Sequence, residues 1–300
     1  MAVRAAAGAA GRLRGRAGGP ALIVCYAHGG GLGHLTRIRA YLHTRGLTGE
    51  PVTILTGSPF AGDPRVLSGQ RIRSAPAGLG RDDLTRWVRA TLAELRLREL
   101  VVDAFPAGLS GELSAAAVPP GTRVVHLARL LRWDAYRPLL PPEPLEFAQT
   151  WLVEPVGGAH RAYLDAVSSA VAPLALADPP EPRPAVPVEP GGWLIVHSGP
   201  AAELTQLVAY AQDIAAIEGA RPYLTLVSPS RPDALPPEVA HRDVYPAWPL
   251  FAEADRIITA AGCNAVRQLA TWRERHRMLP FPRRFDDQYA RAARARAATP

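Results

Sequence analysis

The chain of 300 residues is 48% hydrophobic and carries a formal net charge of +7, and all of its Lys+Arg positions are arginine. This length suits one large α/β domain or two smaller ones, and the absence of lysine excludes a Walker-A loop, a Schiff-base lysine and a lysine general base. No apolar run approaches the roughly 18 residues of a membrane span, and two isolated cysteines, Cys25 and Cys263, indicate a reduced, cytosolic setting rather than a disulfide framework.

The first 20 residues contain arginines but no acidic residue, and they lack the apolar core of a secretory signal. We expect them to form a disordered tail. A second group of arginines lies near the other end of the chain, at Arg291, Arg294 and Arg296. Because the positive charge is concentrated at the ends and no nucleic-acid-binding motif accompanies it, we expect no nucleic-acid partner.

Apolar, strand-like runs alternate with amphipathic runs through the first half of the chain. This alternation is typical of a parallel sheet covered by helices on both faces. Strands are expected at 21–27, 52–57, 71–76, 100–105, 122–128 and 150–155. Helices are expected at 35–46, 81–98 and 159–171, where apolar residues recur at three- and four-residue spacing.

A proline-rich segment, "ADPPEPRPAVPVEPGG" at 177–192, interrupts the alternation. Proline is excluded from helix interiors and central strands, so we interpret this segment as a linker between an N-terminal domain at 21–176 and a C-terminal domain at 193–300. In the second half, strands are expected at 192–199, 222–229, 256–262 and 276–282, and helices at 201–218, 263–273 and from about 285 onward. The fold class is therefore α/β, with two doubly wound, Rossmann-like domains in tandem.

A glycine-rich turn, "HGGGLGH" at 28–34, separates the first predicted strand from the first helix. Such a turn lets the backbone approach a ligand, with helix amides directed at it. The spacing of Gly29, Gly31 and Gly33 is not that of a dinucleotide fingerprint, and the second strand ends without the acidic residue that would bind a ribose. A tight turn without a ligand is the alternative, but it does not explain His34 in the first turn of the helix.

Four motifs in order resemble those of one family. The stretch "GGGLGHLTR" (29–37) resembles the first loop of GT-B glycosyltransferases, both the bacterial peptidoglycan N-acetylglucosaminyltransferase-like group and predicted glycosyltransferases with "GLGHLxR". The stretch 101–113 resembles a second block of the latter group. In the C-terminal half, 259–270 is similar to the glycine turn and helix of nucleotide-sugar binders, and 280–292 to their closing Asp-Gln block. The resemblance implies two domains facing across a cleft.

The resemblance also implies an activity: transfer of a sugar from a nucleotide-sugar donor, UDP-linked, to the hydroxyl of an unidentified acceptor, with inversion. The N-terminal domain would hold the acceptor and the C-terminal domain the donor. No cofactor or metal is expected, because helix N-termini and backbone amides meet the diphosphate charge, and no cluster in the sequence has metal-ligand spacing. A nucleotide-sugar 2-epimerase on the same fold and a non-catalytic nucleotide-sugar-binding protein remain open as alternatives.

Direct displacement at an anomeric carbon needs a base that takes the proton of the acceptor hydroxyl. His34 is the first candidate, because its ordinary pKa of about 6.5 suits this task and the loop places it in the expected cleft. Asp103, at the end of a neighbouring parallel strand, is expected to orient the imidazole. Glu112 is a rival candidate for the base.

The donor-binding prediction combines turn glycines, phosphate contacts and hydroxyl contacts. Its residues are Gly31, Gly33, Ser198, Gly199, Gly262, Asn264, Gln268, Arg284, Asp287 and Gln288. Gln268 lies where the resemblance implies a glutamate that binds the ribose, which leaves donor affinity in question. Arg284, or its neighbour Arg283, is expected to contact phosphate in bidentate fashion.

Structural alternatives accompany several of these residues. Asn264 is also suited to cap the helix that follows Gly262, and Asp287 to begin the last helix. The acceptor is not readable, because its pocket is expected in variable loops at 60–70 and 130–148. Exposed arginines and leucines leave peripheral contact with a membrane open.

Overall fold

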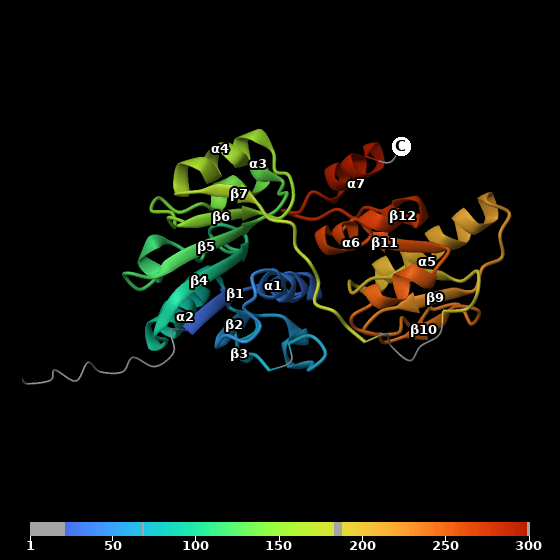
Figure 1. Cartoon of the computed structure of the whole chain (residues 1–300), viewed down its shortest axis with the longest axis horizontal. Helices are drawn as coiled ribbons and strands as arrows, with labels where there is room; N and C mark the ends of the chain where they lie inside the picture. Colours follow the sequence, from blue (N-terminus) through green and yellow to red (C-terminus); the bar gives the residue numbers. More distant parts are fainter. Residues whose placement is uncertain (1–21, 68, 183–187, 299–300) are drawn as a thin grey trace, which may run out of the picture.

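The computed structural model describes residues 22–67, 69–182 and 188–298. Two sheets lie in the two halves of the chain, one of seven strands and one of five (Figure 1). Neighbouring strands in both sheets are parallel. The predicted disordered tail, residues 1–20, lies outside the described residues.

The first sheet forms the N-terminal lobe, with the strand order β3-β2-β1-β4-β5-β6-β7. Its strands are β1 (Leu22–Tyr26), β2 (Val52–Thr56), β3 (Arg71–Ser74), β4 (Leu97–Ala104), β5 (Arg123–Ala128), β6 (Gln149–Leu152) and β7 (Val171–Pro173). Its helices are α1 (Leu32–Thr44), α2 (Arg81–Glu94), α3 (Trp133–Tyr136) and α4 (Gly158–Val167), with 3-10 turns η1 (Pro59–Gly62), η2 (Ala115–Ala117) and η3 (Arg137–Leu139). The order reverses between β1 and β4, so the crevice beyond their carboxyl ends is where such sheets bind ligands.

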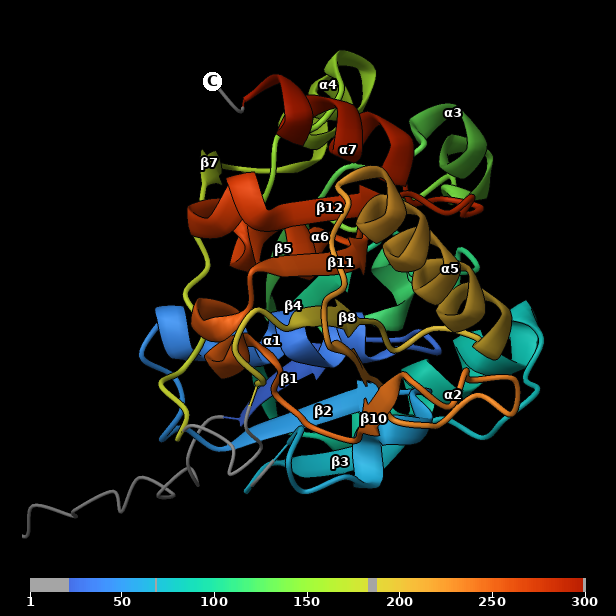
Figure 2. The ribbon, with the colours of Figure 1, turned by 90° about the vertical axis from the view of Figure 1, so that its right-hand side faces the viewer.

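The second sheet forms the C-terminal lobe, with the order β10-β9-β8-β11-β12. Its strands are β8 (Trp193–Val196), β9 (Leu224–Val227), β10 (Ala240–Arg242), β11 (Arg256–Ala260) and β12 (His276–Leu279). Its helical elements are α5 (Ala201–Ile217), η4 (Trp248–Glu253), α6 (Cys263–Gln268), η5 (Ala270–Arg275) and α7 (Gln288–Ala297). Figure 2 shows α5 across one face of this sheet.

Both faces of each sheet are covered, which explains the nearly continuous apolar runs of the central strands. In β1, Ile23 and Cys25 pack with α1 on one face, whereas Val24 and Tyr26 pack with α2 on the other. The second sheet repeats this arrangement, with apolar clusters that include α5 on one side and η4 on the other.

The structure differs from the predicted elements in several places; for example, α2 ends at Glu94 and β4 begins at Leu97, within the predicted helix 81–98. The two three-residue strands β7 and β10 were not expected, and β7 overlaps the end of the predicted helix 159–171 because α4 ends at Val167. The predicted helix 263–273 is shorter, because α6 ends at Gln268 and a 3-10 turn follows. The last helix begins at Gln288 rather than near 285, with Asp287 as its N-cap.

The segment before α7 returns the chain to the N-terminal lobe. The amide of Arg132 donates to the carbonyl of Phe285 at 2.8 Å, and Leu131 forms an antiparallel bridge with Asp286. The Phe285 ring joins an aromatic cluster with Phe105 and Tyr136 of that lobe. Figures 1 and 2 both show α7 at the same end of the molecule as α4.

A candidate active site between the lobes

A cavity of about 280 Å³ lies between the two lobes. The N-terminal lobe contributes the first turns of α1, the η1 loop and Arg129 after β5. The C-terminal lobe contributes the ends of β8, β9 and β11, the start of α6, and the segment that leads into α7. The carboxyl ends of strands from both sheets therefore open into one cleft, as expected for doubly wound domains.

The glycine turn between β1 and α1 accommodates the imidazole of His34. A Cβ atom added to Gly29 would lie 2.6 Å from Cδ2 of His34, closer than real contacts allow, whereas Gly30 and Gly31 have open space. Gly31 is the N-cap of α1, and Gly33 lines the cavity. The glycine at position 29 is thus needed because the histidine five residues later folds back over it.

His34 and Asp103 are brought into contact. Nδ1 of His34 lies 2.8 Å from Oδ2 of Asp103, because β1 and β4 are parallel neighbours whose carboxyl ends meet at one edge of the sheet. Arg37, one turn further along α1, donates from Nε to Oδ1 and from Nη2 to Oδ2 of Asp103. Sequence reasoning did not single out Arg37.

Burial and charge fix the protonation of this pair. Burial lowers the pKa of His34, and the positive charges of Arg37 and Arg129 lower it further against the opposing effect of Asp103. Burial would raise the pKa of Asp103, but Arg37 and His34 outweigh it and hold that pKa at about 2. At neutral pH the pair is therefore a neutral imidazole and a carboxylate, with Nδ1–H facing Asp103 and Nε2 left with a lone pair.

Glu112 does not belong to the cleft, which corrects the prediction of a rival base. Its side chain is buried and accepts from the Tyr26 hydroxyl at 2.6 Å and from the amides of Leu109 and Ser110 at 3.0 and 2.7 Å. Its carboxylate packs against Gly108, whose φ of 78° suits only glycine. Glu112 stabilises the turn after β4.

Asn264 and Gln268 face the cavity from α6. Asn264 does not cap this helix; its Nδ2 donates to the carbonyl of Gly33 at 2.8 Å and so joins the two lobes. Among the described residues, Oδ1 of Asn264 and Nε2 of Gln268 are buried without a hydrogen-bond partner. Gly262 is the N-cap of α6, lines the cavity and leaves open space where a Cβ would be.

The loop after β8 contributes Ser198 to the cavity wall, but not Gly199. A Cβ on Gly199 would collide with His197, whose Nε2 lies 2.8 Å from Oε2 of Glu203. Arg283 donates to both oxygens of Glu203, at 2.6 and 2.5 Å. The charge of Arg283 is thereby neutralised within the protein.

Arg284 is also outside the wall of the cavity. Its guanidinium carbon lies 4.6 Å from the centre of the Phe285 ring. Neither arginine is placed as the predicted bidentate phosphate ligand, because one pairs with Glu203 and the other stacks on an aromatic ring.

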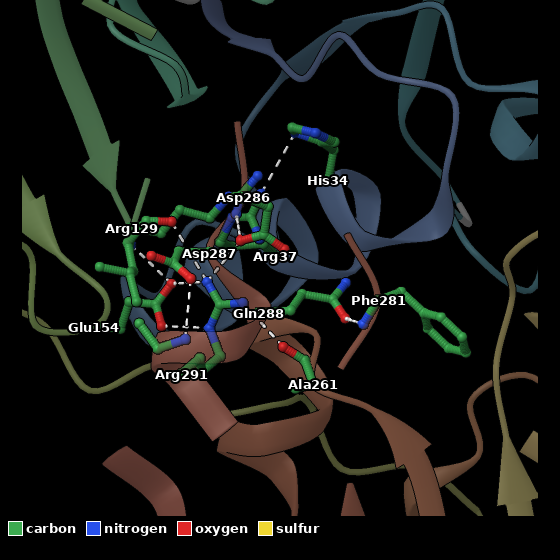
Figure 3. A network of polar contacts seen from close by, with 12 residues as sticks. His34, Arg37, Arg129, Glu154, Ala261, Phe281, Asp286, Asp287, Gln288 and Arg291 are labelled. Atoms are coloured by element: carbon green, nitrogen blue, oxygen red, sulfur yellow. Dashed lines mark hydrogen bonds and ion pairs between the residues drawn. The ribbon is translucent and has the colours of Figure 1, made fainter. Parts of the chain in front are cut away.

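The Asp-Gln block contributes differently from the prediction (Figure 3). Asp287 accepts from the amide of Ala290 at 3.0 Å and caps α7, and it is not part of the cavity wall. Gln288 lines the cavity, and its Oε1 accepts from the amide of Phe281 at 3.0 Å. Asp286, which sequence reasoning did not assign to the site, lines the cavity instead.

Asp286 belongs to a largely buried network that joins the lobes, in which both arginines are buried and both carboxylates are half-buried (Figure 3). It accepts from Nη1 of Arg129 and from Nη2 of Arg291 at 2.8 Å, and Arg291 donates twice to Glu154 at 2.7 Å. Burial would raise the pKa of Asp286, but Arg129 and Arg291 hold it at about 2. The sequence shows an aspartate doublet, but which member faces the cleft depends on where α7 begins.

Aromatic side chains enclose another part of the cavity. Tyr245 and Trp248 line it, with ring centres 6.3 Å apart, and the guanidinium of Arg39 lies over both rings. The Tyr245 hydroxyl is 3.0 Å from Oγ1 of Thr36, which is another contact between the lobes. Within the described ranges, no three His, Cys, Asp or Glu side chains are grouped to hold a metal ion, and no helix has the length and apolar character of a membrane span.

No family model matches the chain, and no curated protein does. Solved structures do match it. SsfS6, a glycosyltransferase of Streptomyces sp. SF2575 complexed with thymidine diphosphate, is similar with a TM-score of 0.61 and 11% identity, over 93% of this chain and 86% of that one. The spinosyn rhamnosyltransferase SpnG, complexed with thymidine diphosphate, is similar with a TM-score of 0.53 and 13% identity, over 93% and 84%.

A third structure is that of UDP-N-acetylglucosamine 2-epimerase from Rickettsia bellii, with a TM-score of 0.52 and 9% identity, over 84% of this chain and 77% of that one. At such identities the likeness shows the fold and no more. It confirms the predicted fold class, a GT-B arrangement of two Rossmann-like lobes.

Proposed function

We propose that this protein is a glycosyltransferase that moves a sugar from a nucleotide-sugar donor to an acceptor hydroxyl, with inversion and without a metal. The observation that carries the proposal is the hydrogen-bonded pair of His34 and Asp103 at a cavity between two lobes of glycosyltransferase-like fold. A neutral imidazole with one nitrogen held by a carboxylate is the arrangement of a general base.

In the proposed reaction, Nε2 of His34 takes the proton of the acceptor hydroxyl while its oxygen forms a bond to the anomeric carbon. The bond between that carbon and the phosphate oxygen breaks, and the nucleoside diphosphate leaves. Asp103 then stabilises the imidazolium through the bond at Nδ1, 2.8 Å long in the resting protein. A positioned base typically contributes about 10²–10⁴-fold to the rate.

We assign donor binding to those predicted residues that line the cavity, namely Gly33, Ser198, Gly262, Asn264, Gln268 and Gln288. Two of them support a polar ligand directly, because Oδ1 of Asn264 and Nε2 of Gln268 are buried and lack partners among the described residues. Buried polar groups are normally satisfied, so a ligand with hydroxyl and phosphate groups suits this wall. We propose a UDP-linked donor, and the thymidine diphosphate in two similar structures makes TDP-linked sugars the first alternative to test.

The experiment offers UDP-, GDP- and TDP-sugars to the protein with a panel of acceptors and measures release of the nucleoside diphosphate. We expect turnover with one donor class, unchanged by EDTA. His34→Gln should lower kcat about 10²–10⁴-fold with little change in donor affinity. His43→Gln, in the last turn of α1 and away from the cavity wall, is the matched control. Normal turnover in His34→Gln would exclude His34 as the base.

The second candidate function is epimerisation of a nucleotide sugar, and the structural likeness to UDP-N-acetylglucosamine 2-epimerase favours it. An epimerase changes its substrate without an acceptor. Incubation with UDP-N-acetylglucosamine alone in D₂O therefore separates the two, because conversion of the sugar with uptake of deuterium at C2 would contradict glycosyl transfer.

A further inference from the structure

Arg37 is a buried charge that the proposed reaction does not use. It lies on α1 one turn after His34, and only 3% of its surface is exposed. A buried guanidinium destabilises a protein unless it is paired and hydrogen-bonded. Its partner is Asp103, which is itself 2% exposed. The pairing therefore satisfies both charges, but it also joins Arg37 to the residue that orients His34.

Asp103 has donors on both of its oxygens. Nε of Arg37 donates to Oδ1, and Nη2 donates to Oδ2 at 2.8 Å; this same Oδ2 also contacts Nδ1 of His34 at 2.8 Å. A guanidinium fork of this kind fixes the plane of a carboxylate, which a lysine ammonium does not. The direction in which Oδ2 faces the imidazole is thus set by Arg37.

The charges around His34 come from several elements. Asp103 of β4 is the anion in contact with it, and Arg37 of α1 is the nearest cation, with Nη2 3.4 Å from Nδ1. Arg129, after β5, also acts on the imidazole, but its charge is paired with Asp286 of the segment before α7. The Cys263 thiol of α6 shares the cavity and is neutral, because burial raises its pKa to about 11.

We propose that Arg37 is a positioning residue of the His34–Asp103 pair. Its guanidinium fixes the Asp103 carboxylate in line with the imidazole, and its positive charge lies beside both groups. The proposal rests on the proposed function only where it concerns turnover. Its electrostatic part concerns the titration of His34, which is measurable without any substrate.

The first experiment follows His34 by NMR in protein labelled with ¹⁵N and ¹³C histidine, with its signal assigned among the eight histidines by loss in His34→Gln. Arg37→Gln keeps a donor for Asp103 but removes the charge. We expect it to raise the midpoint of the His34 titration by about one pH unit, because the negative charge of Asp103 then favours the protonated imidazole without the opposing positive charge of Arg37. Arg86→Gln, which removes an exposed arginine of α2, should leave the midpoint unchanged.

The second variant, Arg37→Lys, keeps the charge and removes the fork. We expect an unchanged titration midpoint but a smaller fraction of the Nδ1–H tautomer in the ¹⁵N spectrum, and kcat reduced about tenfold at constant KM. A midpoint that Arg37→Gln does not move, or Arg37→Lys with the wild-type tautomer fraction, would overturn the proposal. Both readouts are spectroscopic, so they remain decisive if no glycosyl transfer is found. If Arg37→Gln does not fold, the tautomer fraction in Arg37→Lys supplies the test.

Discussion

At the scale of single residues, buried and half-buried ionisable side chains at the cleft are held in different charge states. Asp103 and Asp286 stay charged because arginines donate to them, whereas His34 stays neutral beside its carboxylate. The difference lies in the partners: each aspartate accepts from guanidinium groups of fixed charge, but the imidazole loses its proton when burial makes a charge costly. The cleft therefore contains a neutral imidazole next to charges that are paired.

Three buried histidines outside the cavity wall should make the folded protein less stable in acid. Burial lowers the pKa of His126 to about 4, and that of His160 and His276 to about 3. In the unfolded chain these three histidines bind protons near pH 6.5, but in the folded protein they do so only near pH 4 and below. The free energy of unfolding is therefore unaffected by them above pH 6.5 and falls as the pH drops toward 4. Urea denaturation between pH 7.5 and 4.5 should show this loss.

His160→Phe tests this account at one site. The His160 ring stacks on Trp133 at 4.3 Å, and within the described part of the chain neither of its nitrogens has a hydrogen-bond partner. Phenylalanine keeps the stacking and cannot be protonated, so we expect a smaller loss of stability in acid, by up to about 1.4 kcal/mol per pH unit. An unchanged pH dependence would show that His160 does not contribute to it.

At the scale of elements, the backbone of the turn before α1 leaves the space in which the His34 imidazole lies. Gly29→Ala places a Cβ within 2.6 Å of the His34 ring, so we expect the imidazole to be displaced and kcat to fall by at least tenfold while the fold is retained. Gly30→Ala is the matched control, because nothing lies within 4 Å of its added Cβ. Equal turnover in the two variants would contradict this account of the turn.

Asp287, at the start of α7, allows a structural role and a binding role to be tested separately. Asp287 accepts from the amide of Ala290, so Asp287→Ala should lower the free energy of unfolding by about 1 kcal/mol. Asp287→Asn keeps a cap oxygen, so the free energy of unfolding of this variant should stay close to that of the wild type. We expect neither variant to change donor affinity by calorimetry. If Asp287→Asn weakens donor binding without loss of stability, Asp287 contacts the donor, as the resemblance implied.

The elements show which features the sequence could predict. Long apolar runs such as β1 and β4 are recognisable because both faces of the sheet are buried, whereas β7 and β10 have three residues each and carry no periodic signal. Asp103 could be predicted as a partner of His34, because parallel strands end at one edge. Gly29 could be predicted only as a turn residue, since its contact with the histidine depends on a side-chain rotamer.

At the scale of the whole molecule, the two lobes are joined by contacts that no local pattern encodes. Asn264 donates to Gly33, and Asp286 accepts from Arg129, in each case across the boundary between lobes. The sequence predicted donor binding for Asn264, with a helix cap as the alternative, and no role for Asp286. The contacts of both residues across the lobes were not predictable, because they depend on how the lobes approach each other. The two sheets lie within the predicted domains 21–176 and 193–300, yet the segment around Phe285 packs on the opposite lobe.

We propose above all that the cleft between the lobes binds the nucleoside diphosphate part of a sugar donor through the C-terminal lobe. Isothermal titration calorimetry of UDP, GDP and TDP against the wild type and Gln268→Ala tests it most directly, because Nε2 of Gln268 is buried in the cavity wall without a partner among the described residues. We predict that one nucleoside diphosphate binds the wild type, and that Gln268→Ala weakens it by at least about tenfold, the loss of one to two hydrogen bonds. Absence of binding by all three, or equal affinity for the wild type and Gln268→Ala, would contradict the claim.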